Sequence, residues 1–354
     1  MTRAHARISP PALRPGGTIG IFAPSSDEAG RFPSRADRAA RFLRAEGFRV
    51  KAAPNAFATG LFTAGPARQR VEDLHSLWAD PEVDVVLATV GGNNTNELLD
   101  LVDYDFIASC PKILVGYSDT TALLTAVWSR TGLTTFMGPQ LMPQFGEVGG
   151  CLPYTLASFR KVLGEARPAG PIAPSTQWTD VRGDWSGPDD EPRGLVATSG
   201  PRVVKPGAAT GPVFAANLDT LLRLAGTRYW PDLKGHVVLL ESGDSSPSRL
   251  AAQLTQLRHA GVLAGAVGLG LGRFPAAGES SALLADTLRD AFRDFPGPVV
   301  ADLDIGHTDP MICVPNGIAV SLEASEGSAD SPDSPHALLS FEEPAVIPHH
   351  RSHS

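Results

Sequence analysis

Residues 111–124, Pro-Lys-Ile-Leu-Val-Gly-Tyr-Ser-Asp-Thr-Thr-Ala-Leu-Leu, decide the fold of this chain. An apolar run ends at Gly116, a serine follows two positions later, and the sequence continues with the pattern of a helix. A strand-to-helix turn of this kind presents a serine hydroxyl at the edge of a sheet, next to backbone N–H groups that stabilise an oxyanion. The nucleophile-elbow pattern is only half matched, because Thr120 stands in place of its second glycine. Ser118 is a candidate nucleophile, although a serine here also suits the N-cap of the following helix.

Two later segments place an acid and a histidine after predicted strands. Residues 237–240, Val-Val-Leu-Leu, lead into Glu241, and His307 lies in a loop after the apolar residues 298–301. Sites in open α/β sheets assemble at the carboxyl ends of strands, so Ser118, Glu241 and His307 are predicted to meet as a catalytic triad. Taken singly, Glu241 also fits a solvated strand end, and His307 a loop histidine bonded to a nearby carboxylate.

The composition favours a large globular protein with two domains. The chain has 354 residues, 42% of them hydrophobic, whereas a single core rarely grows beyond about 250–300 residues. Only 19% of the residues are charged and the net charge is −8, which opposes a surface for nucleic acid polymers or anionic membranes. Cys110, Cys151 and Cys313 lack metal-ligand spacing, and their odd number argues against a disulfide framework.

Targeting and cofactor motifs are missing from the sequence. Prolines interrupt the basic residues near the N-terminus, which therefore lack the apolar region of a signal peptide. No stretch approaches the roughly 20 apolar residues of a transmembrane helix. Residues 91–94, Gly-Gly-Asn-Asn, lack the spacing of a dinucleotide fingerprint. The sequence predicts a cytoplasmic enzyme that needs neither a metal nor an organic cofactor.

The order of the predicted elements indicates an α/β fold. Strand-like runs alternate with helical patterns from residue 18 onward, which is typical of a Rossmann-like, mainly parallel sheet with helices on both faces. Residues 1–165 are predicted to form this N-terminal domain with the nucleophile. The proline-rich residues 166–212 are predicted to be a crossover linker and substrate loop. Residues 213–348 are a predicted distinct C-terminal α/β domain with the acid and the base, and residues 349–354 a disordered tail.

Over nearly its whole length the chain resembles the LD-carboxypeptidase family of serine peptidases. The resemblance rests on short motifs that match in order and spacing: residues 19–26, 70–90 and 91–92, the Gly-Tyr-Ser-Asp run at 116–119, Glu241, and residues 306–310. The chain length and residues 136–147, Phe-Met-Gly-Pro-Gln-Leu-Met-Pro-Gln-Phe-Gly-Glu, look more like the microcin C immunity protein branch than the shorter murein-recycling enzymes.

The resemblance implies roles for the same residues. Ser118 matches the nucleophile, Glu241 the acid and His307 the base of a triad that forms an acyl-enzyme. It also implies an active site at the interface between the two domains, and a homodimer. The sequence departs from the family pattern at Asn93, where an aromatic residue is common, and at residues 215–216, where two alanines replace glycines.

Further residues are predicted to contact the substrate. The backbone N–H groups of Gly92 and Asp119 are the predicted oxyanion hole. Gly91, Asn93 and Trp185 are predicted to bind substrate.

The segment 166–212 carries two tryptophans. Trp185 resembles the family's loop aromatic that stacks on the nucleotide base of microcin-like substrates, an interaction worth about 1–3 kcal/mol per base. Trp178 is predicted to pack at the domain junction.

Two activities fit these roles. The first is hydrolysis of the amide that links an aminoacyl or peptidyl group to a nucleotide in microcin C-like toxic conjugates, which would give antibiotic resistance. The alternative is a murein tetrapeptide LD-carboxypeptidase that releases terminal D-alanine in cell-wall recycling. Trp185 and Asn93 favour the first activity. The lack of a His-Gly-Gly motif opposes an α/β-hydrolase esterase, and the complete set of Ser118, Glu241 and His307 opposes a binding protein without turnover.

Overall fold

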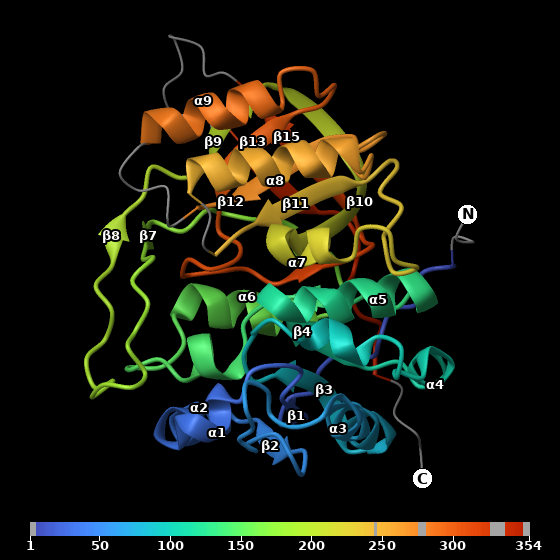
Figure 1. Ribbon diagram of the computed structural model, residues 1–354, viewed down its shortest axis with the longest axis vertical. Coiled ribbons are helices and arrows are strands. Elements are labelled where there is room, and N and C mark those ends of the chain that lie inside the picture. The colour runs from blue at the N-terminus through green and yellow to red at the C-terminus, as the bar shows by residue number, and fades with distance from the viewer. Residues whose placement is uncertain (1–4, 244–245, 275–280, 326–336, 350–354) are drawn as a thin grey trace.

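The computed structural model describes residues 5–243, 246–274, 281–325 and 337–349. Two α/β units are stacked, the N-terminal one at the bottom of Figure 1 and the C-terminal one at the top. A parallel-rich first sheet and a second sheet, both with helices, confirm the predicted fold class. Residues 350–354 of the predicted disordered tail lie outside the described residues. None of the described helices is both long and apolar enough to cross a membrane.

The first sheet consists of N-terminal strands and one strand from late in the chain. Its order is β14-β5-β4-β3-β1-β2, and all neighbours are parallel except β14, which pairs antiparallel with β5. All residues of β1, β3 and β4 are buried, which explains why the sequence supplies continuous apolar runs there. The strands are β1 Thr18–Phe22, β2 Arg49–Ala52, β3 Val83–Ala88, β4 Ile113–Gly116, β5 Phe136–Met137 and β14 Val314–Pro315.

Helices and short turns connect these strands. Pro33 begins α2, where its missing N–H is tolerated, and α5 ends at Gly132, whose φ of 77° is left-handed. The helices are α1 Glu28–Arg31, α2 Pro33–Ala45, α3 Ala67–Ala79, α4 Tyr104–Ser109, α5 Thr121–Thr131 and α6 Pro153–Gly164. The short turns are η1 Thr95–Leu98, η2 Ser118–Thr120 and η3 Leu141–Phe145.

The second sheet has the order β6-β16-β15-β10-β11-β12-β13-β9, and its strands β10 to β13 are parallel. The strands are β6 Gly170–Pro171, β9 Arg202–Lys205, β10 Gly207–Asn217, β11 Val237–Glu241, β12 Gly268–Gly272, β13 Val299–Leu303, β15 Ala319–Ala324 and β16 Ala337–Phe341. Both edge strands, β6 and β9, come from residues 166–212. The same segment contains β7 Gln177–Trp178 and β8 Val196–Ala197, which pair with each other and project at the left of Figure 1.

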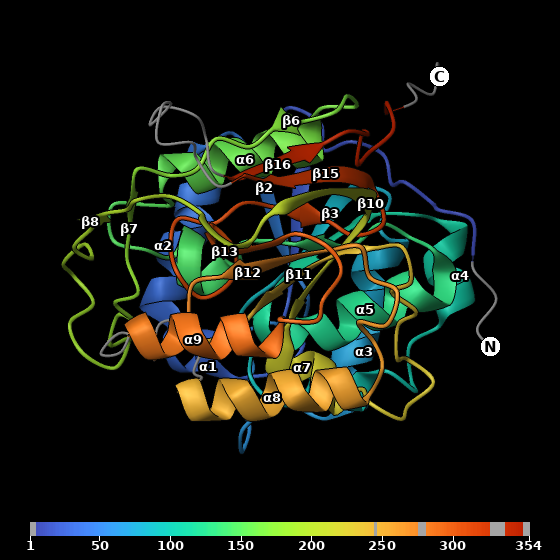
Figure 2. The same cartoon turned by 90° about the horizontal axis from the view of Figure 1, so that it is seen from above.

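The helices of the second unit are α7 Leu218–Arg223, α8 Pro247–His259 and α9 Ser281–Ala291. Figures 1 and 2 show α8 and α9 side by side over one face of the second sheet. The short helix α7 lies where the two units meet and packs against both α5 and α8.

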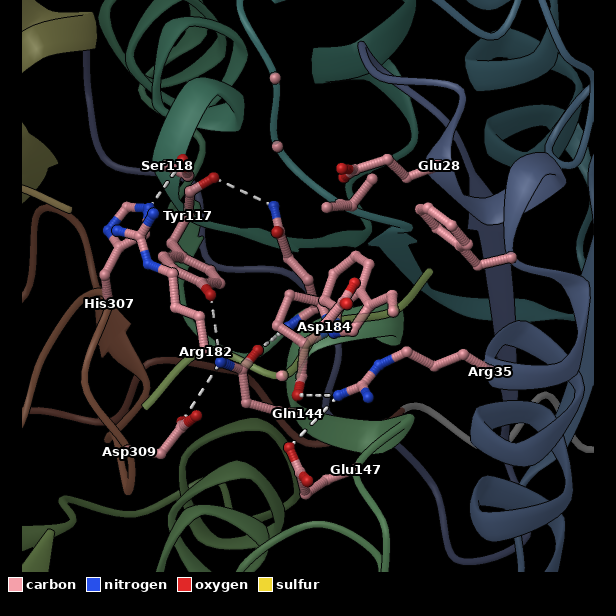
Figure 3. Close-up of a pocket in the computed structure, with 18 of the residues that line it drawn as sticks. Glu28, Arg35, Tyr117, Ser118, Gln144, Glu147, Arg182, Asp184, His307 and Asp309 are labelled. Atoms are coloured by element: carbon pink, nitrogen blue, oxygen red, sulfur yellow. Dashed lines mark hydrogen bonds and ion pairs between the residues drawn. The ribbon is translucent and has the colours of Figure 1, made fainter. Parts of the chain in front are cut away.

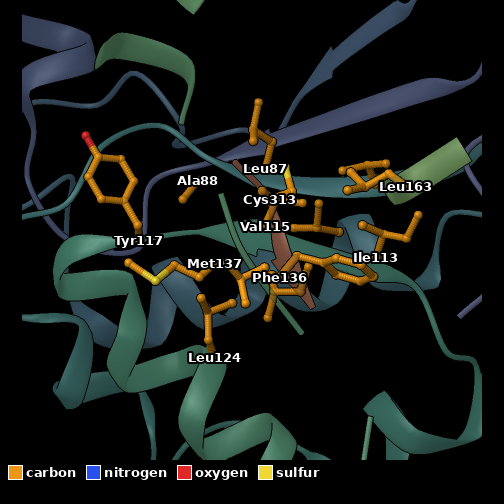
Figure 4. Close-up of a cluster of buried hydrophobic side chains, with 14 of the residues drawn as sticks. Leu87, Ala88, Ile113, Val115, Tyr117, Leu124, Phe136, Met137, Leu163 and Cys313 are labelled. Atoms are coloured by element: carbon orange, nitrogen blue, oxygen red, sulfur yellow. The ribbon is translucent and has the colours of Figure 1, made fainter. Parts of the chain in front are cut away.

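An apolar core continues from the first sheet to one face of the second. Figure 4 shows its part around β3, β4 and β5, with Leu124 of α5 packed against them. Val213 and Ala215 of β10 belong to this core, whereas Phe214 and Ala216 pack in the core beneath the helices of the second unit. Successive side chains of β10 point to opposite faces, as strand geometry requires, so β10 separates the two cores.

Candidate active site

The candidate nucleophile lies in the turn between β4 and α5. Ser118 has a φ of 57°, in the left-handed region that a non-glycine residue occupies only when its surroundings enforce it. A Cβ atom at Gly116 would lie 2.6 Å from Cγ2 of Thr120. Position 116 therefore requires glycine, because the Thr120 side chain packs directly against it.

The structure brings Ser118, Glu241 and His307 together. His307 Nε2 lies 3.0 Å from Ser118 Oγ, and His307 Nδ1 lies 2.6 Å from Glu241 Oε2. Both are hydrogen-bond distances. When Nδ1–H donates to the carboxylate, Nε2 is the acceptor for the serine hydroxyl. Figure 3 shows His307 beside Ser118 at the edge of the pocket.

Glu241 is the fully buried last residue of β11. Its Oε1 accepts a hydrogen bond of 2.9 Å from Asn217 Nδ2, while Oε2 faces His307. Both carboxylate oxygens thus have partners, which a buried charge requires. A Cβ atom at Gly306 would lie 2.3 Å from Glu241 Oε2, and Gly306 has a φ of 87°. Only glycine fits directly before His307.

The imidazole of His307 packs against Gly243 and Tyr117. A Cβ atom at Gly243 would lie 2.6 Å from the ring, and the Tyr117 ring is inclined at 65° with its centroid 5.0 Å away. Burial raises the pKa of the Tyr117 phenol, which therefore stays neutral and accepts a hydrogen bond of 3.1 Å from Gln144 Nε2. These contacts hold the ring orientation that the two hydrogen bonds of His307 need.

The loop after β3 contains two consecutive glycines, and the backbone of Gly91 lies against the nucleophile. A Cβ atom at Gly91 would lie 2.8 Å from Ser118 Oγ. Gly92 has a φ of 144°, and a Cβ atom there would lie 2.4 Å from Ser25 Oγ. The Ser25 hydroxyl accepts the N–H groups of residues 93 and 94 at 3.1 and 3.0 Å. Steric demands on both sides therefore require two consecutive glycines at this point.

Two predicted site residues, Asp119 and Asn93, are not among those that line the cavity. Asp119 is 2% exposed, and its Oδ2 accepts the N–H and the hydroxyl of Thr95, both at 2.8 Å. Asn93 Oδ1 accepts a hydrogen bond of 2.9 Å from Arg223 Nη2. The Asp119 N–H, predicted for the oxyanion hole, lies 3.4 Å from the Cβ position of Gly91. The Asp119 and Asn93 side chains therefore form hydrogen bonds to Thr95 and Arg223 beside the nucleophile.

A cavity of about 540 Å³ opens at Ser118. Gly91, Gly92 and Trp185, which the sequence predicts to contact substrate, are among the residues that line it. The half-buried Trp185 ring stands edge-on to Phe32 at 6.2 Å between centroids, and the Arg35 guanidinium lies 4.7 Å from the Trp185 ring. Trp185 therefore brings an aromatic surface from the segment 166–212 to the cavity of the nucleophile.

Buried ion pairs support the cavity wall. Arg193 places Nε 2.6 Å from Glu147 and Nη2 2.7 Å from Asp309. Arg35 lies 3.2 Å from Glu147 and 2.6 Å from Asp189. Burial acts to lower the pKa of Arg193, but Asp309 and Glu147 outweigh it and raise that pKa, so Arg193 stays cationic. The ion pairs tie residues 189 and 193 of the crossover segment to the N-terminal unit.

Several groups at the site were not found from sequence. Asn217 is the last residue of β10 and the N-cap of α7, a position where asparagine is common. Nothing near it in the sequence indicates its hydrogen bond to Glu241. Arg193 lies in no recognisable motif.

Trp178 lies apart from the cavity, with the Arg273 guanidinium 5.3 Å from its ring. Among the residues with described positions, no three His, Cys, Asp or Glu side chains are grouped to hold a metal ion.

The stacked α/β units and the serine-histidine pair between them describe a serine hydrolase with two domains. Comparison with protein families identifies which family of hydrolases this is. The LD-carboxypeptidase N-terminal domain matches residues 19–138, and the LD-carboxypeptidase C-terminal domain matches residues 210–322. The chain belongs to the LD-carboxypeptidase family and is a serine peptidase-type hydrolase, which confirms the resemblance noted in the sequence.

Relatives of two kinds are similar to this chain. The microcin C7 self-immunity protein MccF of Escherichia coli is 30% identical over 330 residues, which are 91% of this chain and 95% of MccF. A probable murein peptide carboxypeptidase of Bacillus subtilis is 31% identical over 324 residues, 90% of this chain and 93% of the relative. Both relatives thus span nearly the full described fold.

Solved structures of MccF have the same fold. MccF in complex with glutamyl sulfamoyl guanosine matches with a TM-score of 0.85 and 27% identity, over 96% of this chain and 99% of MccF. MccF in complex with aspartyl sulfamoyl adenosine matches with a TM-score of 0.86 over the same shares. An MccF-like protein from Bacillus anthracis has a TM-score of 0.85 and 28% identity, over 95% of this chain and 99% of its own.

Proposed function

We propose that this protein hydrolyses the amide that links an aminoacyl or peptidyl group to a nucleotide, with Ser118, Glu241 and His307 as its triad. The observation that carries the proposal is the hydrogen-bond chain from Ser118 through His307 to Glu241, at 3.0 and 2.6 Å, in the wall of a cavity that also receives Trp185. The similarity to MccF supports the substrate class, because MccF binds aminoacyl sulfamoyl nucleosides.

The first step is acylation of the serine. His307 Nε2 takes the proton of Ser118 as Oγ attacks the carbonyl carbon of the substrate. Negative charge then develops on the carbonyl oxygen, where the backbone N–H groups of Gly92 and Asp119 donate hydrogen bonds. One such donor contributes roughly 2.7–4 kcal/mol to lowering the barrier.

The second step releases the nucleotide and frees the enzyme. His307 returns its proton to the leaving nitrogen, so the amide C–N bond breaks and the acyl group stays on Ser118 Oγ. His307 then takes a proton from water, which attacks the ester carbonyl, and returns that proton to Ser118 Oγ as the acyl group leaves as a carboxylic acid. Glu241 stabilises the imidazolium through Oε2. Its other oxygen is held by Asn217, so the carboxylate does not rotate away during the cycle.

The cavity has the size of a small-molecule site. Its volume of about 540 Å³ lies within the roughly 300–1,000 Å³ usual for such sites. Trp185 provides the surface on which the nucleotide base stacks. The proposal includes a homodimer, which the family resemblance implies; sedimentation equilibrium that returns the mass of one chain contradicts that part.

The test is mass spectrometry of reaction products from the wild type and Ser118→Ala. One reaction contains an aminoacyl sulfamoyl adenosine and the other an L,D-linked murein tetrapeptide. Loss of the aminoacyl group that depends on Ser118 supports the proposal. Release of D-alanine that depends on Ser118 supports instead the alternative activity, a murein LD-carboxypeptidase. Product formation by Ser118→Ala at the wild-type rate overturns the triad.

A further inference from the structure

Helix α7 has both of its ends beside the proposed catalytic residues. At its N-terminus, Asn217 caps the helix by accepting the Thr220 N–H at 3.0 Å and holds Glu241 through Nδ2. At its C-terminus, Arg223 reaches across to the N-terminal unit. One helix of six residues thus contacts the acid of the triad at one end and the surroundings of the nucleophile at the other.

Arg223 binds two separate segments at once. Its Nη2 donates to Asn93 Oδ1 at 2.9 Å, and its Nη1 donates to the Asn93 carbonyl and to Asp119 Oδ1, both at 3.3 Å. Asp119 is buried, and its second oxygen accepts the two hydrogen bonds from Thr95. The guanidinium therefore links the loop after β3 to the residue that follows the nucleophile.

Both bound groups adjoin the proposed oxyanion donors. Asn93 directly follows Gly92, and Asp119 contributes one donor through its own backbone N–H. The Ser25 hydroxyl accepts the Asn93 N–H at 3.1 Å and so also holds the chain directly after Gly92. Moving Asn93 or Asp119 by a fraction of an ångström therefore moves a donor relative to the substrate oxygen.

We infer that Arg223 is a positioning residue that sets the geometry of the oxyanion hole from across the domain interface. This inference rests on the proposed function, because it assumes that the N–H groups of Gly92 and Asp119 face the reacting oxygen. Arg223 is not among the residues that line the cavity, so its role is one of positioning. Its side chain is 38% exposed, so its ion pair contributes little to global stability and its effect is on local geometry.

A guanidinium is suited to this task for a geometric reason. Its planar, fixed donors reach three acceptors on two segments, whereas a lysine ammonium is one compact group on a flexible stem. Lysine at position 223 therefore keeps the charge beside Asp119 and loses the simultaneous contact with Asn93. The comparison of Arg223→Lys with Arg223→Ala separates charge from geometry.

The experiment measures steady-state kinetics of Arg223→Ala, Arg223→Lys and the control Arg228→Ala. Arg228 is a nearby, more exposed arginine at 60%, bonded to Asp100. We expect Arg223→Ala to lower kcat by roughly 10–100-fold with KM nearly unchanged, because only transition-state contacts are displaced. Arg223→Lys recovers part of kcat, and Arg228→Ala matches the wild type. Unchanged kcat in Arg223→Ala overturns the inference, as does a loss that appears only in KM.

A double-mutant cycle and hydrogen exchange complete the test. If Arg223 acts through Asn93, the losses in Asn93→Ala and Arg223→Ala are not additive; independent, additive losses contradict the inference. Hydrogen exchange measured by mass spectrometry should rise in Arg223→Ala for peptides that contain residues 91–95 and 118–121, but not in Arg228→Ala. This readout does not depend on turnover. If the wild type shows no turnover that depends on Ser118, the proposed function fails, and unchanged exchange separately refutes the role of Arg223.

Discussion

Asn217 donates a hydrogen bond from Nδ2 to Glu241 Oε1 at 2.9 Å, on the carboxylate oxygen that His307 does not use. The same side chain caps α7 through Oδ1. One amide therefore has two separable tasks: it stabilises a helix start, and it fixes the orientation of the proposed catalytic acid.

Asn217→Ser separates these tasks. Serine is a good N-cap, so the unfolding free energy should stay within about 1 kcal/mol of the wild type. Its short hydroxyl does not replace the amide donor, so kcat should fall by about tenfold or more as Glu241 loses its second partner. Asn217→Ala loses cap and donor together and is the comparison. Wild-type kcat in Asn217→Ser would show that Glu241 is oriented without this bond.

Replacing Ser118 by alanine or glycine tests both chemistry and backbone strain. Both variants lack Oγ, so kcat should fall by up to about 10⁶-fold if Ser118 is the nucleophile. Glycine adopts the left-handed conformation without strain. The free energy of unfolding of Ser118→Gly should therefore be about 1 kcal/mol higher than that of Ser118→Ala. Urea denaturation of the two inactive proteins measures the difference. Equal stabilities would mean that the φ of 57° carries no strain.

Trp185→Ala should raise KM for an aminoacyl nucleotide and not for a murein peptide. Loss of one stacked base, worth about 1–3 kcal/mol, corresponds to roughly 5–150-fold in KM. Trp178→Ala is the matched control, since Trp178 does not line the cavity. An equal rise in KM for the murein peptide contradicts stacking on the base.

Arg193→Met should destabilise the protein strongly. The Arg193 side chain is 14% exposed and pairs with Glu147 and Asp309, which are 8% and 6% exposed. Glu147 keeps Arg35 as a partner, but the buried Asp309 carboxylate loses its cation. Breaking a buried ion pair in this way lowers the unfolding free energy by about 3–5 kcal/mol. Arg38→Ala is the control, because Asp189 keeps Arg35 as a partner. A loss in Arg193→Met as small as that in Arg38→Ala would refute this account.

His236 should make the protein less stable in mild acid. Burial lowers its pKa below the ordinary value of about 6.5. The unfolded chain therefore binds the proton more readily, so the contribution of His236 is complete above about pH 6.5 and is lost as the pH falls through the folded pKa. His236→Asn should show a smaller drop in Tm between about pH 7.5 and 5.5 than the wild type. The exposed His259→Asn serves as the control, and an unchanged drop in His236→Asn contradicts the prediction.

The parallel strands at the centre of each sheet were predictable because their apolar runs are local. The apolar run that ends at Gly116 forms β4, and residues 237–240 form β11 together with Glu241. Residues 96–101 have a helical pattern, but only the short η1 turn at Thr95–Leu98 forms there. In the segment 166–212, β6 and β9 pair with β16 and β13, which lie more than a hundred and nearly a hundred residues later, so local periodicity does not reveal them.

The three residues of the proposed triad could be predicted from sequence because each lies at or just after a recognisable apolar run. Ser118, Glu241 and His307 meet at hydrogen-bond distances. They do not share one sheet edge, because Ser118 follows β4 of the first sheet, whereas Glu241 ends β11 and His307 follows β13 of the second sheet. The supporting groups were not accessible, because their partners are set by the packing of two units. Arg223 and Asn93 are 130 residues apart, and nothing near either one indicates the other.

Strand β14 has a consequence for recombination within the family. Val314–Pro315 completes the first sheet by pairing with β5, shortly after the loop that carries His307. A chimera joined in the segment 166–212 therefore receives the edge strand of its N-terminal sheet from the other parent. The N-terminal part expressed alone leaves β5 as an open edge, which invites aggregation. Exchange of substrate loops between relatives should accordingly succeed more often than exchange of whole halves.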